Sequence, residues 1–124
     1  RFGAVPHGAQ LRAPAIYPQR LVDALIEEFR ERPAVEAAFV AELYVPADLE
    51  PPHPVIGILS SVDAFVTICQ QVGPIAEQAA GGAGRVDFAY MGHQEADRIT
   101  TYLRQETTPF YQRVASKPWW KLWK

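Results

Sequence analysis

The strongest constraint on this fold is a change in the spacing of apolar residues at Pro33. Before Pro33, apolar residues recur every three or four positions, which is the period of one face of a helix. They are Leu21, Val22, Leu25, Ile26 and Phe29. From residue 35 to 45 alternate residues are apolar, which is the period of one face of a strand. They are Ala37, Phe39, Ala41, Leu43 and Val45. The sequence therefore predicts a helix from Pro18 to just before Pro33, followed directly by a strand.

Proline, glycine and serine residues mark the next elements. The segment PADLEPPHP, residues 46–54, has four prolines in nine residues and predicts a loop before a strand at 55–59. Either of the two serines after that strand, Ser60 or Ser61, can cap a second helix. This helix is expected to run to about Ala80, with a kink or break at Gly73 and Pro74.

The glycine-rich stretch GGAG, residues 81–84, ends the second helix. Because it follows a helix rather than a strand and no GK[ST] comes after it, it predicts a turn and not a phosphate-binding loop. A strand at 86–90 and a third helix at 94–105 follow, the latter with Ile99, Tyr102 and Leu103 facing inward. The order α-β-β-α-β-α predicts a two-layer α+β fold, with a small, mostly antiparallel or mixed sheet and helices packed on one face.

The length of 124 residues corresponds to a single domain with one core. Residues 1–17 read as an entry arm or interdomain linker, with a short strand near Leu11. Residues 18–113 form the predicted α+β domain. Residues 114–124 form a tail rich in tryptophan and lysine.

The net charge of −2 conceals an uneven distribution. All four basic residues after position 106 lie in a segment without acids, whereas the rest of the chain has eight basic and fourteen acidic residues. An acidic body repels phosphate, so the main domain is not expected to bind nucleic acid.

The residue types that most often carry chemistry are scattered. Cys69 is the single cysteine, which excludes an intrachain disulfide and a CxxC zinc site, and its place on an apolar helix stripe predicts burial. The three histidines, His7, His53 and His93, are expected to cap helices or face solvent. His93 and Asp97 are spaced for one helix face, but two ligands without a third favour a surface pair. We therefore expect no metal and no cofactor.

The second face of the strand at 35–45 is predicted to be wetter than the first. It carries Glu36, Ala38, Val40, Glu42 and Tyr44. The two glutamates, six residues apart, are separated by about 20 Å on an extended strand, too far to share a proton, even with Asp87 nearby. We therefore interpret the face as solvated or in contact with a partner, with Val40 and Tyr44 as candidate contact residues.

The tail ends in KPWWKLWK, residues 117–124. On a helical projection its lysines fall on one side, opposite Trp119, Trp120, Leu122 and Trp123. Burial of three indole rings outweighs the entropy of ordering so short a segment, so we expect these four residues to dock on a surface. That surface is the chain's own domain, a second copy of the chain or another protein. A membrane surface ranks third, because three cations give weak attachment, and a nucleic acid ranks fourth.

Three stretches of the chain resemble the C-terminal domain of the SseB family, proteins named for enhanced serine sensitivity. The stretches are YPQRLVDALIEEFRERPAVEAAFVAEL, PPHPVIGI and DRITTYLRQETTPFYQR, and the resemblance runs from about Val5 to Arg113. It implies a cytoplasmic bacterial protein in which a related N-terminal domain precedes this one, with no established activity or cofactor. The final TPFY suggests that Pro109 stops the third helix while Phe110 and Tyr111 fold back on the core.

The sequence favours a non-enzymatic domain that contacts a protein partner, its own N-terminal domain or a second copy, the last giving a homo-oligomer. The alternative is a regulator that binds a small molecule such as an amino acid. An enzyme is the third hypothesis, for which no nucleophile, base or metal set clusters in the sequence.

Overall fold

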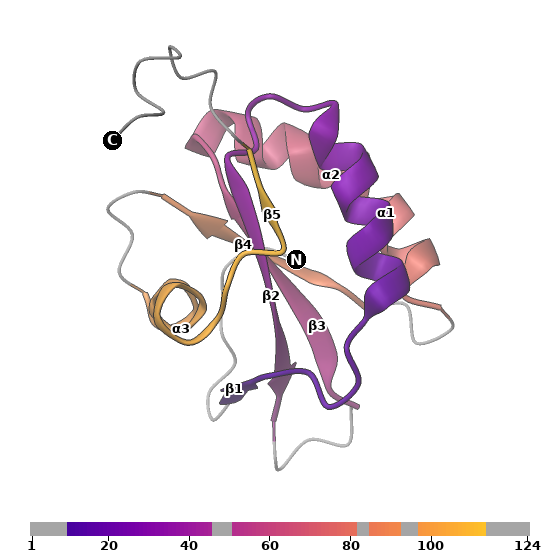
Figure 1. Ribbon diagram of the computed structural model, residues 1–124, viewed down its shortest axis with the longest axis vertical. Coiled ribbons are helices and arrows are strands. Elements are labelled where there is room, and N and C mark those ends of the chain that lie inside the picture. Colours follow the sequence, from indigo (N-terminus) through magenta and orange to yellow (C-terminus); the bar gives the residue numbers. More distant parts are fainter. Residues whose placement is uncertain (1–9, 46–50, 82–84, 93–96, 114–124) are drawn as a thin grey trace, which may run out of the picture.

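The computed structural model describes residues 10–45, 51–81, 85–92 and 97–113, which form a mixed five-stranded sheet with helices on both faces (Figure 1). In chain order the elements are β1 (Gln10–Arg12), α1 (Gln19–Arg30), β2 (Ala37–Tyr44), β3 (His53–Leu59), α2 (Val62–Ala79), β4 (Asp87–Met91), α3 (Arg98–Glu106) and β5 (Tyr111–Gln112). The α+β class and the order α-β-β-α-β-α are confirmed. The short strand expected near Leu11 is β1, and β5 is an addition.

Strand β2 organises the sheet. One of its edges pairs antiparallel with β3 over the full length, so that Ala37 lies opposite Leu59 and Leu43 opposite His53. Its other edge is shared by two short antiparallel strands, with β1 near the end of β2 and β5 near its beginning. Beyond β3, strand β4 runs parallel to it, and α2 forms the crossover between the two. The sheet is thus mixed because β4 is added in parallel to the antiparallel pair of β2 and β3.

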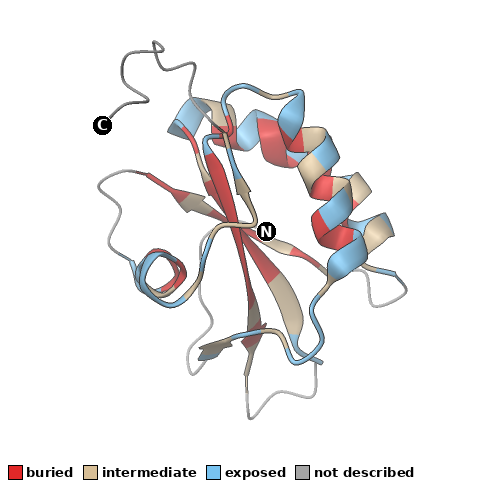
Figure 2. Cartoon of the chain, viewed as in Figure 1, coloured by how far each residue is buried: buried red, intermediate tan, exposed pale blue. Residues whose placement is uncertain are grey.

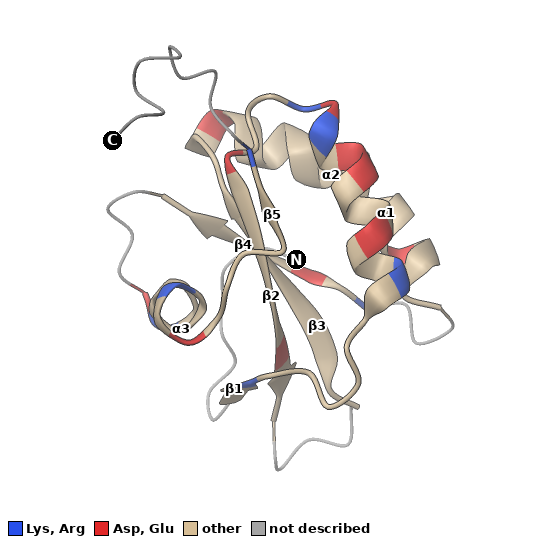
Figure 3. Ribbon diagram, viewed as in Figure 1, with Lys and Arg blue, Asp and Glu red and all other residues tan. Residues whose placement is uncertain are grey.

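Helices α1 and α2 cover one face of the sheet and form the larger core (Figure 2). Helix α1 is amphipathic, with Leu25 and Phe29 completely buried and acidic residues along its exposed side (Figure 3). Helix α2 adds Phe65 and Val72, which meet Ile56 and Ile58 of β3 in the same cluster. The expected inward stripe of α1 is confirmed, except that Ile26 is only partly buried.

Helix α3 covers the opposite face and forms a second core cluster. Ile99 and Leu103 are buried there against Phe39 and Met91, and Tyr102 is half-buried at the margin, as the sequence predicts. Gly57 of the central strand β3 allows α3 to pack closely on the sheet. A Cβ atom at this position would lie 2.5 Å from both Leu103 Cδ1 and Met91 Sδ.

The structure corrects two details of the layers. The helices do not all pack on one face, since α3 lies across the sheet from α1 and α2. The second face of β2 is not wet either, because Ala38 and Val40 are buried beneath α1 and α2, at 0% and 7% exposure. The reason is that residues 37–41 are all apolar, so both faces of this strand are covered. Glu36 and Glu42, which suggested a wet face, flank this apolar run.

Element ends follow local capping. Ser61 caps α2 by accepting a hydrogen bond from the Ala64 amide at 3.3 Å, and the helix continues past Pro74 as one element. Gly81, with φ of 84°, follows its last turn in the left-handed conformation that favours glycine. Helix α3 begins at Arg98, later than expected, because the Asp97 carboxylate caps it through the Thr100 amide at 2.9 Å.

The end of the described chain is fastened to α1. Phe110 and Tyr111 lie on Phe29, with ring centroids 6.4 and 5.8 Å away, which confirms that these aromatics fold back on the core. The Arg113 guanidinium donates to main-chain carbonyls at and after the end of α1. These contacts hold β5 against the start of β2.

Candidate functional site

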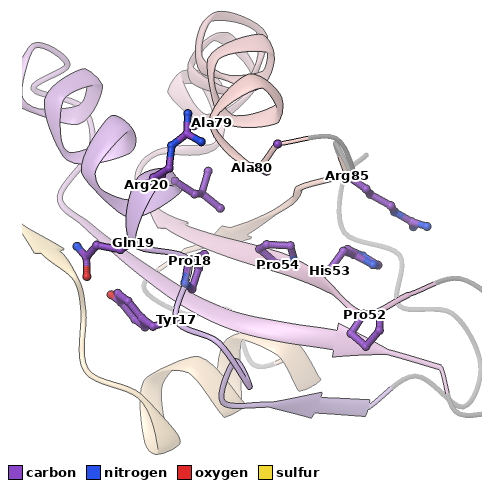
Figure 4. A pocket seen from close by; sticks show the side chains of 12 residues that line it. Tyr17, Pro18, Gln19, Arg20, Pro52, His53, Pro54, Ala79, Ala80 and Arg85 are labelled. Carbon is purple, nitrogen blue, oxygen red and sulfur yellow. The ribbon is translucent and has the colours of Figure 1, made fainter.

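A pocket of about 390 Å³ opens where the first turn of α1, the start of β3 and the last turn of α2 meet (Figure 4). Its size is within the range of small-molecule sites, roughly 300 to 1,000 Å³. The lining residues are Tyr17, Pro18, Gln19, Arg20, Leu21, Pro52, His53, Pro54, Ala79, Ala80, Gly81 and Arg85. Segments far apart in the sequence therefore build one concave surface.

Local sequence explains how each wall is placed. Pro18 fixes the chain at the entry to α1, where the Gln19 amide donates to the Tyr17 carbonyl at 2.9 Å. Gly81 turns the chain away after α2. The proline-rich segment before β3 contributes Pro52 and Pro54, whose rings give an apolar floor without backbone donors.

His53 and Arg85 form the polar wall, and the Asp87 carboxylate contacts both of their side chains. His53 Nε2 lies 2.8 Å from Asp87 Oδ2, and the His53 side chain is only 11% exposed. Arg85 lies 3.5 Å from the same carboxylate oxygen. Since β3 and β4 are parallel with Val55 opposite Asp87, the histidine and the aspartate meet across neighbouring strands. The expectation that His53 faces solvent or caps a helix is therefore wrong, because strand pairing brings it under cover.

The lining is cationic. It includes Arg20, Arg85 and a histidine, and none of its residues is Asp or Glu. Tyr17 stands at the mouth beside Asp23, and partial burial, with a smaller contribution from that carboxylate, raises the pKa of the Tyr17 phenol. The phenol therefore remains a neutral hydrogen-bonding group at neutral pH.

The lining also limits the chemistry. Its described residues include no serine, threonine or cysteine that could act as a nucleophile. The Nε2 atom of His53 is engaged with the Asp87 carboxylate at 2.8 Å. The walls are largely apolar, with a few polar groups among them, which is the composition of a binding pocket.

The residues singled out from the sequence do not gather at this pocket. Val40 is buried in the larger core. Tyr44 is half-buried and bound within the chain, since its hydroxyl lies 2.6 Å from Gln10 Oε1 and the Arg12 guanidinium lies 4.1 Å from its ring centre. The tail residues Trp119, Trp120, Leu122 and Trp123 lie outside the described residues. Contact of Tyr44 and of the tail with a partner remains a prediction.

The other candidates are placed as follows. Cys69 is buried as predicted, and burial raises the pKa of its thiol to about 12. Glu42 pairs with Arg12 at 2.6 Å and Glu36 stays exposed beyond the other end of β2, so the two glutamates share no site. Asp97 caps α3, while His7 and His93 lie outside the described residues. Within the described ranges, no three His, Cys, Asp or Glu side chains group so as to hold a metal ion.

Arg20, Arg85 and the pairing of His53 were not predicted from the sequence as parts of a site. One signal was present: PPHP places a histidine at the boundary between a proline loop and a strand. The partner Asp87 could be found only by knowing that β3 and β4 pair in parallel, in the observed register.

The fold and pocket define a small α+β domain with a cationic ligand-sized cavity. Residues 5–113 match the family model described as SseB protein C-terminal domain, and the chain belongs to this family. The resemblance inferred from the sequence is thus confirmed. No curated protein and no solved structure matches the chain. Among the described helices, none combines the length and apolar character needed to cross a bilayer.

Proposed function

We propose that this domain binds a small molecule in the pocket between α1, β3 and α2, and that it is not an enzyme. The observation that carries the proposal is the pocket lining: a cavity of about 390 Å³ with largely apolar walls and a small number of polar side chains. The lack of serine, threonine and cysteine among the described lining residues supports binding over catalysis. This favours the small-molecule hypothesis, with amino acids as the first class to test.

The test is a titration of isotope-labelled protein with the twenty common amino acids, serine included, at millimolar concentration. Binding is expected to shift the amide resonances of Leu21, Ala80 and Gly81, which line the pocket. Replacing Ala80 with Phe fills the cavity and is expected to weaken binding at least tenfold. The matched control is Gln78→Phe, which adds the same ring to an exposed position of α2 outside the lining. Equal binding by Ala80→Phe and the parent protein contradicts the proposal.

A second candidate function, contact with a protein, is favoured by a different observation. Ile16 is 87% exposed, and it precedes Tyr17, which is 47% exposed and lines the pocket. Large apolar side chains in such a position suit a partner surface. The partner classes stay those inferred from the sequence: another protein, an N-terminal domain or a second copy of the chain. Replacing Ile16 with Asp is expected to abolish capture of such a partner without changing amino-acid binding.

A reducing compartment is proposed as the place of action. The supporting observation is that Cys69, the single cysteine of the chain, is free and buried. A cytoplasmic location is the corresponding proposal. Fractionation of cells that express the full-length protein tests it.

A further inference from the structure

The charge of the pocket differs from that of the rest of the domain. Outside the last eighteen residues, acids outnumber bases by fourteen to eight, yet the lining has two arginines and no acid. Asp87 lies behind the wall, where it pairs with His53 and Arg85 and so offsets part of the charge of Arg85. A net positive pocket in an acidic protein selects for an anion.

Arg20 is the cation best placed to meet that anion. Arg12, Arg30 and Arg32 each lie within 3.2 Å of a carboxylate oxygen. No described carboxylate lies within ion-pair distance of Arg20, which is exposed and lines the pocket across from His53 and Arg85 (Figure 4). Its planar guanidinium presents paired donors that match the two oxygens of a carboxylate.

The apolar walls of the pocket indicate what kind of molecule carries the anionic group. Pro18 and Pro54 offer hydrocarbon surface in the same lining as Arg20, and Ala79 leaves room at the end of α2. A strongly hydrated dianion such as phosphate would lose much of its hydration against such walls. A single carboxylate on an apolar body can place its charge at Arg20 and its hydrocarbon on the prolines.

We propose that the pocket binds the carboxylate of a small organic acid with an apolar body, and that Arg20 is its main charged contact. This inference rests on the proposed small-molecule function and adds the ligand class and the residue that recognises it. Arg85 acts as a second positive group, which Asp87 holds in place. The phenol of Tyr17 closes one side of the mouth.

The experiment compares four probes at equal concentration on the full chain: 3-methylbutanoate, 3-methylbutanamide, 3-methylbutylamine and inorganic phosphate. The readout is the amide resonances of Leu21 and Gly81 in isotope-labelled protein. The acid is expected to bind at least about tenfold more tightly than the isosteric amide, because a charged pairing is lost in the amide. The amine and phosphate are expected to bind still more weakly.

Variants assign the contact. Arg20→Gln is expected to weaken binding of 3-methylbutanoate about tenfold or more, while Arg20→Lys, which keeps the charge, retains part of it. The matched control is Arg98→Gln, which removes one positive charge from α3 on the other face of the sheet. Both positions are exposed, and circular dichroism checks that each variant folds.

The outcomes separate the two proposals. If the amide binds as well as the acid, or if Arg20→Gln binds the acid like the parent protein, the carboxylate inference is overturned and the small-molecule function stands. If phosphate binds most tightly, the site takes an inorganic anion and the inference is again overturned. If no probe and no amino acid shifts the pocket resonances, both proposals fall.

Discussion

The guanidinium of Arg113 lies 2.9 Å from the main-chain carbonyl oxygen of Phe29, joining residues 84 positions apart in the sequence. The same side chain also donates to the carbonyls of Arg30, Arg32 and Val35. The last carbonyls of a helix have no partners within it, and a cation is favoured near them. Arg113 thus closes the end of α1 from outside the helix.

Replacing Arg113 with Ala is expected to lower the free energy of unfolding by about 1 to 3 kcal/mol, because several carbonyls lose a charged donor. Urea denaturation followed by circular dichroism measures the change. Arg98→Ala serves as the control, since no hydrogen bond of the Arg98 side chain is seen in the described residues. An Arg113→Ala protein as stable as the control would show that water replaces the guanidinium without cost.

Replacing Gly57 with Ala is expected to destabilise the domain by about 1 to 3 kcal/mol through overpacking. The added methyl group would lie 2.5 Å from Leu103 Cδ1 and from Met91 Sδ, so α3 or the side chains beneath it must move. Thermal unfolding measures the loss, and amide resonances of α3 show whether the helix shifts. Unchanged stability together with unchanged α3 resonances contradicts the close packing described.

Stability is expected to decrease above pH 9 because of Cys69. The thiol pKa rises from 9.0 in the unfolded reference to about 12 in the fold, through burial. Ionisation therefore favours the unfolded chain as pH rises from 9 towards 12, and below pH 9 the thiol has no effect. The expected loss at pH 10.5 is about 2 kcal/mol. Urea denaturation at pH 7.5, 9 and 10.5 should show a slope that Cys69→Ala reduces; an equal slope in both proteins excludes the thiol as its cause.

The expectation that the tail docks on a surface predicts the result of a truncation. Removing residues 114–124 is expected to change stability, oligomeric state or capture of a partner, because the truncation removes the four apolar residues that are expected to dock. Light scattering coupled to size exclusion, urea denaturation and pull-down measure these three properties. If all three stay the same, the tail has no docking surface.

The truncation is separable from the pocket experiments. Arg113 follows β5, which pairs with the beginning of β2, whereas His53 lies opposite Leu43 near the end of β2. Arg113, the last described residue, and the pocket are therefore at opposite ends of the same strand, about 20 Å apart at the rise of an extended chain. Ligand binding in the truncated protein is expected to equal that of the full chain.

Hydrophobic period and capping residues were sufficient to predict most of the fold. The switch at Pro33 placed α1 and β2, and the serine pair placed the start of α2, since these signals are local. Which faces of the sheet the helices cover was predicted less well. Residues 37–41 are apolar on both faces of β2, so their spacing does not distinguish a covered face from a wet one. Strand β5 has two residues, too few for any period to appear.

The pocket depends on contacts that no local pattern contains. Arg20 belongs to a helix whose signal is its apolar stripe, and Arg85 precedes a short strand. Their common cavity arises because the beginning of α1 meets the end of α2. The pairing of His53 with Asp87 requires the parallel register of β3 and β4. Such long-range geometry is set by packing, and the sequence alone leaves it open.

The shared edge of β2 has a consequence for biosynthesis. Residues 10–12 pair with one half of this edge and residues 111–112 with the other. While the chain is still being translated, the half that waits for Gln112 stays bare and can join strands from neighbouring nascent chains. Residues 111–112 thus act as a seal on the edge of a strand made long before them.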